Sequence, residues 1–316
     1  KPVTKYFDRI TRPEHILQTL PQAIQTMLDP ADCGPACLSL SQDVQGETYE
    51  YPEEFFKERV HNIRRPRPDD FQIKQAAEQI KKSKNPLLIS GGGVFYSDAM
   101  EDLSNFAIKH NIPVTQTVMG YSTMKRDHSH FLGPIGGLGG KAANNLAKQT
   151  DLAIAVGTKL ADFTTGSWAN FENPDFSLVS VNVSRFDASK HLAQSVIGDA
   201  KVSLQELSNA LGDWKAPDEW HKKSRDELKN WNDYVDKESG PTNQELPSYA
   251  HAVGAIYRNS DPTDIAVTAA GGLVGEVVQI WRPKELNTHE TEWGFSCMSY
   301  EISGALGVKM ANPDKE

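Results

Sequence analysis

Apolar and polar positions near the start of the chain first follow helical spacing and then form a short apolar run. The helical pattern lies within residues 12–28, where its apolar members are Ile16, Leu17, Leu20, Ile24 and Leu28. Residues 34–40 follow as an apolar run, which predicts a short buried strand. A segment this short cannot bury a stable core alone. We therefore expect residues 1–47 to be the end of an α/β domain and residues 48–70, rich in acidic, aromatic and proline residues, to be a linker.

From residue 71 onward, helical patterns alternate regularly with apolar runs of strand length. The predicted strands are residues 86–90, 112–117, 151–157 and 177–183, and the predicted helices are residues 71–83, 100–109, 141–150 and 202–211. Strands that alternate with helices form a parallel sheet with right-handed crossovers. The sequence therefore predicts the α/β class, with a Rossmann-like parallel-sheet central domain over residues 71–212 flanked by incomplete α/β domains.

Residues 213–316 begin with a charged, tryptophan-rich stretch and end with a helix of small apolar residues. The first stretch predicts a surface helix followed by a loop. After it we expect a helix at residues 247–258, a strand at 264–269, a second helix opening after residue 272, and a last helix at 302–310. We interpret residues 213–316 as a linker helix and the beginning of another α/β domain.

Charge and composition exclude several classes of protein. The net charge of −9 argues against a general nucleic-acid surface, which would carry clustered Lys and Arg. No apolar run approaches the roughly 18 residues that a membrane helix needs, so we expect no membrane contact. Three cysteines in 316 residues do not form a disulfide framework, and this count fits a reducing, cytoplasmic compartment.

Two glycine-rich turns in the middle of the chain have two possible explanations. Gly137-Leu138-Gly139-Gly140-Lys141-Ala142 matches the spacing of a dinucleotide fingerprint, but residues 130–137 before it do not read as a convincing strand. A tight structural turn is the favoured interpretation, and phosphate binding at the start of the next helix is the alternative. Gly91, Gly92 and Gly93 have the same ambiguity. For His128 and His130 we favour solvated or capping roles over metal binding, because no metal-ligand spacing accompanies them.

The most informative chemistry lies near the end of the chain. Ala270-Gly271-Gly272 follows a predicted strand and opens a helix, so its backbone N–H groups are suited to a diphosphate. Further on, Met298 lies just before the last predicted helix, where it could support a ring. The alternative is that Met298 belongs to the core and that both segments are ordinary turns.

The order of these segments resembles that of thiamine-diphosphate-dependent enzymes of the acetolactate synthase group. The resemblance rests first on GPACLSLSQDVQ, which is similar to the strand that closes the pyrimidine-binding domain. The central-domain pattern follows in PLLISGGG, IPVTQT, LGPIGGLGGKAANN, DLAIAVGTKLADFTTG and IGDA, and AAGGLVGEVVQIW and EWGFSCMSYEISGALGVKMANPDKE resemble the opening of the diphosphate-binding domain. Within the group, TKYFDRITRPE, SQDVQGETYEYPEEFF, AAGGL and WGFSCM most resemble the trihydroxycyclohexane-1,2-dione hydrolases of myo-inositol catabolism.

The resemblance implies a cofactor site near the end of the chain. Gly271, Gly272 and Leu273 match the turn that contacts the diphosphate. Met298 matches the bulky hydrophobe that keeps the cofactor bent, and Ser296 and Cys297 match the positions where backbone groups meet its pyrimidine. Relatives commonly have glycine in place of Ser299.

The resemblance also implies an activity and its requirements. It is the hydrolytic opening of a cyclic dione to a 5-deoxyglucuronic acid, with thiamine diphosphate and Mg²⁺ as cofactors and without FAD. In such enzymes the active sites form between subunits of a homo-oligomer, the activating glutamate lies upstream of the segment corresponding to this chain, and the metal motif lies downstream. We therefore expect no catalytic or metal-binding residue in these 316 residues, and no turnover by them alone.

Two alternatives remain open at this point. An acetolactate synthase or glyoxylate carboligase would join two keto acids instead of opening a ring. A non-catalytic module would use the central domain to bind a nucleotide.

Overall fold

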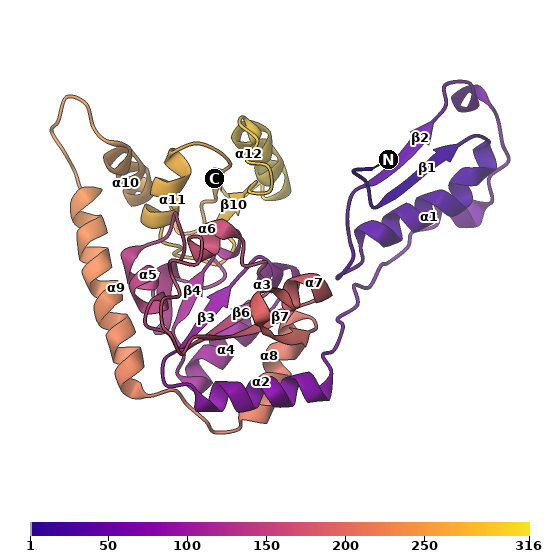
Figure 1. Cartoon of the computed structure of the whole chain (residues 1–316). Coiled ribbons are helices and arrows are strands. Elements are labelled where there is room, and N and C mark those ends of the chain that lie inside the picture. Colours follow the sequence, from indigo (N-terminus) through magenta and orange to yellow (C-terminus); the bar gives the residue numbers. More distant parts are fainter. Residues whose placement is uncertain (1) are drawn as a thin grey trace. The chain divides into compact units, whose positions relative to one another are not determined.

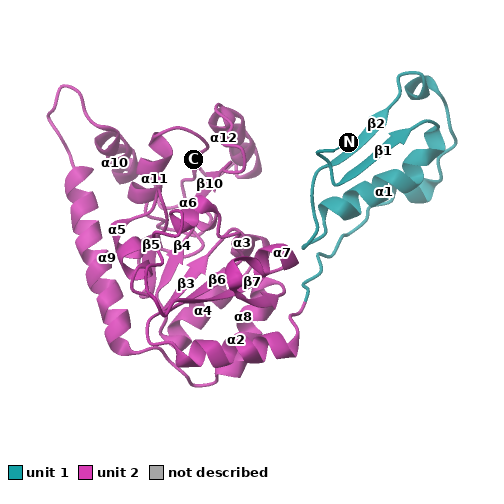
Figure 2. Cartoon of the chain, in the orientation of Figure 1, with its two compact units in different colours: residues 1–66 teal, residues 67–316 magenta. Residues whose placement is uncertain are grey.

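A computed structural model describes residues 2–316 of the chain, which divide into two compact units. The first unit ends at Pro66 and the second spans Arg67–Glu316 (Figure 2). The boundary falls within the proline-rich stretch that the sequence predicts as a linker. Among the described residues, no helix is both long enough and apolar enough to cross a membrane.

The first unit is a small β-α-β arrangement. Strands β1 (Tyr6–Ile10) and β2 (Ala36–Leu40) are parallel, and helix α1 (Ile16–Met27) connects them after a short 3-10 turn, η1 (Pro13–His15) (Figure 1). Two further 3-10 turns follow, η2 (Val44–Gly46) and η3 (Glu53–Phe56). The predicted helix and strand are confirmed. The prediction that the strand is buried is wrong, because one helix packs on this two-stranded sheet and leaves Leu40 51% exposed.

The second unit is built on a six-stranded parallel sheet with the order β5-β4-β3-β6-β7-β8. The strands are β3 (Pro86–Ser90), β4 (Val114–Gln116), β5 (Phe131–Pro134), β6 (Leu152–Val156), β7 (Ser177–Asn182) and β8 (Gln194–Ile197). Every residue of β3 and β6 is buried, as expected for central strands covered on both faces. The predicted α/β class and parallel sheet are confirmed.

Helices cover this sheet on both faces (Figure 1). The longer ones are α2 (Asp70–Lys82), α4 (Met100–His110), α8 (Ala200–Leu211) and α9 (Asp218–Glu238), and the shorter ones are α3 (Gly93–Tyr96), α5 (Lys141–Ala147), α6 (Asp162–Thr165) and α7 (Arg185–Ala188). Two 3-10 turns, η4 (Val118–Gly120) and η5 (Lys190–Leu192), complete the connections. Helix α8 packs on α2 and α4, and α9 packs on α5. Trp220 and Trp231 place the buried face of α9 in the same core as the sheet.

The structure corrects one step of the strand prediction. Residues 131–134, which were not expected to form a strand, are the edge strand β5. An edge position tolerates Pro134, which has no N–H to donate, and Gly133, whose φ of +94° interrupts regular pairing. Strands β1, β8 and β10 were also missed, because they are short or carry charged and polar residues.

The C-terminal elements form a second small parallel sheet with its own helices. They are α10 (Tyr249–Asn259), β9 (Ala266–Thr268), α11 (Leu273–Ile280), β10 (His289–Thr291) and α12 (Tyr300–Ala311). The loop after β4 holds this group, since the Ser122 carbonyl accepts the Asn287 N–H at 3.3 Å and the Ser122 hydroxyl accepts the Thr288 N–H at 3.2 Å. The division of residues 71–316 into a central domain and a following domain stays a prediction; in the structure they belong to one compact unit.

Glycines at the carboxyl ends of β3 and β6 allow two backbone segments to touch. A Cβ added at Gly93 would lie 2.6 Å from the Gly157 Cα, closer than real Cβ atoms approach other atoms. The Gly93 N–H donates to the Gly157 carbonyl at 2.9 Å. Close packing thus accounts for Gly93 without any ligand.

Replacing Gly93 by alanine therefore has a definite expected cost. We expect Gly93→Ala to lower the free energy of unfolding of the second unit by about 1–3 kcal/mol, because the clash is with backbone and cannot be relieved by a rotamer change. Gly307→Ala is the matched control, since nothing lies within 4 Å of its Cβ position in α12. The control should be neutral or stabilise by up to about 1 kcal/mol. Chemical denaturation of both variants tests this, and equal effects would contradict it.

A second prediction concerns His289, the first residue of β10. Burial lowers its pKa to about 4. The unfolded chain would then bind a proton at higher pH than the folded chain does. Stability should fall by about 3 kcal/mol as the pH drops from about 6.5 to about 4. The free energy of unfolding, measured by denaturation at several pH values in this range, should depend less on pH in His289→Asn than in the control variant His191→Asn, in which an exposed histidine is replaced. Identical pH dependence in the two variants would refute the role of His289.

Candidate cofactor-binding site

The turn between β9 and α11 is open and shaped by glycine. Gly271 has a φ of +87°, a conformation that favours glycine, and no atom lies within 4 Å of a Cβ placed at Gly271 or Gly272. Gly271, Gly272 and Leu273 are exposed. The first N–H groups of a helix lack partners within it, so the start of α11 directs backbone donors toward this open space.

A glutamate shapes the segment between β10 and α12. The Glu292 carboxylate accepts the N–H of Phe295 at 2.8 Å and the N–H of Cys297 at 2.6 Å. These backbone hydrogen bonds lower the pKa of Glu292, first of all the one from Cys297. Two serines take left-handed conformations here, Ser296 with a φ of +51° and Ser299 with a φ of +73°. The value at Ser299 belongs to the region that glycine adopts without strain, so serine keeps a glycine-like backbone at this position.

Met298 lies on the surface at the end of this segment. Its side chain is 84% exposed, and that of the neighbouring Phe295 is 91% exposed. Met298 is therefore not part of the core, and the alternative that it is a core residue is wrong.

One hydrogen bond joins the two segments. Glu301 is the second residue of α12, and its carboxylate accepts the Ala270 N–H at 3.2 Å. Helix α12 also packs against β9. The structure thus brings the turn at 271–273 near the start of the helix that follows residues 296–298.

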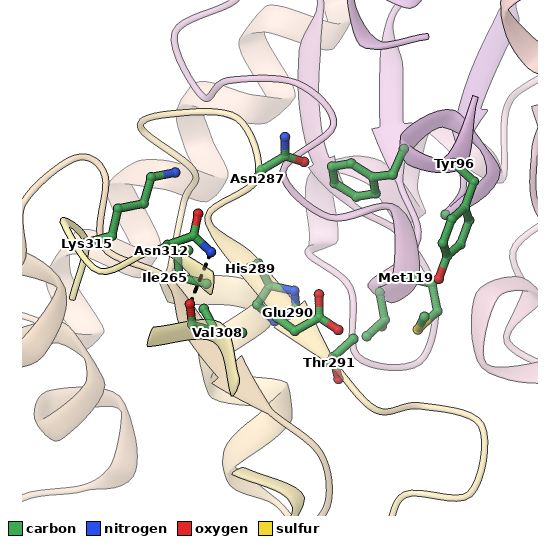
Figure 3. A pocket seen from close by; sticks show the side chains of 13 residues that line it. Tyr96, Met119, Ile265, Asn287, His289, Glu290, Thr291, Val308, Asn312 and Lys315 are labelled. Atoms are coloured by element: carbon green, nitrogen blue, oxygen red, sulfur yellow. Dashed lines mark hydrogen bonds between the residues drawn. The ribbon is translucent and has the colours of Figure 1, made fainter. Parts of the chain in front are cut away.

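A cavity of about 360 Å³ lies beside β10, and none of the six candidate residues lines it. In Figure 3, His289, Glu290 and Thr291 of β10 face Tyr96 and Met119. The Tyr300 hydroxyl donates to Glu290, but burial is the larger effect and raises the pKa of this carboxyl. The cavity and the candidate site are therefore separate features.

Metal ligands do not cluster in the part of the chain that the structure describes: residues 2–316 contain no group of three or more His, Cys, Asp or Glu side chains placed to hold an ion. The expectation that His130 is solvated or a cap is wrong. Its ring is buried and stacks on His221 with 4.3 Å between centroids, and burial lowers its pKa to about 4.

The glycines around residue 137 are close-packed in the structure. The Gly137 N–H donates to the Phe163 carbonyl at 2.7 Å, and a Cβ on Gly140 would lie 2.5 Å from the Trp231 indole nitrogen. Close packing explains these glycines, in agreement with the prediction of a tight structural turn.

Sequence reasoning missed Glu292 and Glu301. A glutamate a few residues from a glycine-containing loop gives no distinctive pattern, because its role depends on backbone N–H groups that converge only after folding. Glu292 and Glu301 lie a few residues before and after Met298 in the sequence, but this spacing does not by itself predict a role for either.

Comparisons with known proteins identify what the chain resembles. Residues 73–207 match the model of the thiamine pyrophosphate enzyme central domain. The whole chain is 39% identical to a protein of Clostridium perfringens and 41% identical to one of Clostridium tetani, both named 3D-(3,5/4)-trihydroxycyclohexane-1,2-dione hydrolase. A protein of Shouchella clausii with the same name is 39% identical.

These matches cover 100% of this chain and 53% of each relative, so the chain spans about half the length of the curated relatives that it matches. The family match covers β3 to most of α8, the elements that build the six-stranded sheet. Residues 73–207 therefore form the central domain of a thiamine pyrophosphate enzyme.

Proposed function

We propose that this chain works as part of a thiamine-diphosphate-dependent hydrolase that cleaves a C–C bond in a trihydroxycyclohexane-1,2-dione. The observation that carries the proposal is the similarity to hydrolases of this name along the entire chain, at 39–41% identity. The expected product is a 5-deoxyglucuronic acid, formed during myo-inositol catabolism.

The open turn at the start of α11 fits the diphosphate of this cofactor. A side chain at Gly271 or Gly272 would fill the space that the diphosphate needs, and neither position has one. The N–H groups of Gly271, Gly272 and Leu273 would bind the diphosphate, with Mg²⁺ as its counter-ion. When bound, thiamine diphosphate supplies the stabilisation of a carbanion.

The segment that ends in Met298 would hold the ring portion of the cofactor. Met298 would support the bend between the rings, and the backbone of Ser296 and Cys297 would meet the pyrimidine. The hydrogen bonds of Glu292 support this proposal, because they fix the backbone of that segment before any ligand binds.

A homo-oligomer is part of the proposal. Ile302, Leu306 and Met310 are spaced four residues apart along α12 and are 78%, 62% and 76% exposed. Such an apolar stripe is suited to contact with another protein surface. The absence of FAD, the cytoplasmic location and the lack of turnover by these 316 residues alone stay predictions.

The decisive assay uses the full-length protein that carries this sequence. Opening of the trihydroxycyclohexanedione ring should require added thiamine diphosphate and Mg²⁺, and pyruvate should not be consumed. Pyruvate consumption without ring opening would instead assign an acetolactate synthase or glyoxylate carboligase activity. Nucleotide binding by the protein with no response to thiamine diphosphate would assign a binding module.

The role of Met298 gives a further prediction. In the full-length protein, Met298→Ala should raise the thiamine diphosphate concentration needed for half-maximal activity by about tenfold, because a buried methionine contact is worth about 1.5 kcal/mol. Leu246→Ala is the control, because Leu246 lies in a loop and has a similar exposed fraction, 86% against 84% for Met298. Thermal unfolding of both variants should match the parent protein. Equal cofactor dependence in the two variants would exclude Met298 from the site.

A further inference from the structure

Glu301 lies where the two segments of the proposed cofactor site meet. It is the second residue of α12, and its carboxylate accepts the N–H of Ala270 from the turn before α11 at 3.2 Å. Its own backbone N–H and the N–H of Ala270 are the leading causes that lower its pKa, so the carboxylate is ionised at neutral pH.

Helix α12 has few other means of fixing its position. None of its twelve residues is buried, so packing of apolar side chains contributes little at either end. Glu290 accepts a hydrogen bond from Tyr300, which ties the start of the helix to β10. The bond from Ala270 to Glu301 ties the same start to the turn at 271–273.

The charge of Glu301 also acts on the turn. The Ala270 N–H that this carboxylate accepts directly precedes, along the chain, the N–H groups of Gly271 and Gly272, which the proposed function assigns to a diphosphate. Like charges repel, and within a Debye length of about 8 Å at physiological salt this repulsion is only partly screened.

We propose that Glu301 is a positioning residue with two separable effects: its oxygen holds the 270–273 turn against the start of α12, and its charge limits the affinity of that turn for anions. The charge effect rests on the proposed function, which supplies the diphosphate as the anion. The positioning effect does not depend on the proposed function.

Two substitutions separate the effects. Glu301→Gln keeps an oxygen that accepts the Ala270 N–H but removes the charge, and Glu301→Ala removes both. Glu276→Gln is the matched control, because Glu276 lies in the first turn of α11, carries the same charge and has no hydrogen bond to the turn recorded in the structure.

Amide hydrogen exchange of the 316-residue chain tests the positioning effect. In Glu301→Ala the Ala270 amide should exchange about tenfold faster than in the parent chain, as expected when a hydrogen bond to a charged acceptor is lost. In Glu301→Gln and Glu276→Gln it should change by less than about threefold. Unchanged exchange in Glu301→Ala, or an equally large acceleration in Glu276→Gln, would overturn this part.

Binding of inorganic pyrophosphate, measured by titration calorimetry at low salt, tests the charge effect. Glu301→Gln should bind pyrophosphate about five- to tenfold more tightly than the parent chain, and the difference should shrink as salt is added. An equal increase in pyrophosphate affinity in Glu276→Gln would show that only the net charge of the chain matters, and it would overturn the inference. The absence of binding by any variant would overturn it as well.

These results are distinct from a failure of the proposed function. If ring opening in the full-length protein depends on thiamine diphosphate while Glu301→Gln leaves both pyrophosphate affinity and cofactor affinity unchanged, the inference about charge fails alone. If amide exchange behaves as expected but the full-length protein does not respond to thiamine diphosphate, the positioning effect stands without the cofactor.

Discussion

The loop that follows β4 connects the central sheet to the backbone just before β10. Two residues at strand ends hold this loop: the Gln116 side-chain amide, at the end of β4, donates to the Met124 carbonyl at 3.2 Å, and Ser90, at the end of β3, shares a hydrogen bond with Thr123 at 2.8 Å. These groups are buried, so leaving one unpaired would cost about 1–3 kcal/mol. Ser122 then bonds the backbone leading into β10. The position of β10, and with it the segment that ends in Met298, depends on this buried polar network.

Periodicity predicted those parts of the fold where burial is uniform. Strands β3 and β6 are buried along their whole length, so an apolar run predicted them almost to the residue. Strand β5 contains a glycine and a proline, and only its edge position makes it possible. Strand β1 includes Asp8 and Arg9, and its pairing with β2 comes from residues about thirty positions away. Pairing partners of this kind cannot be read from a local pattern.

In the candidate site, too, local features could be predicted from the sequence and features that depend on distant contacts could not. The glycine turn and the apolar residue before the last helix are local features, and their order along the chain identified them. The left-handed serines and the two carboxylates that receive backbone N–H groups depend on contacts made after folding. Residue type therefore suggested where to place the candidate site, whereas the way its backbone is held needed coordinates.

The order of strands in the central sheet has a consequence for the speed of folding. Strands β3, β4 and β5 follow one another in the chain and pair as neighbours, as do β6, β7 and β8. The pairing of Pro86 with Leu152 joins the two halves and closes the longest loop within the sheet. Gly93 and Gly157 meet only when that pairing forms. A side chain added there should therefore leave the rate of folding nearly unchanged and increase the rate of unfolding.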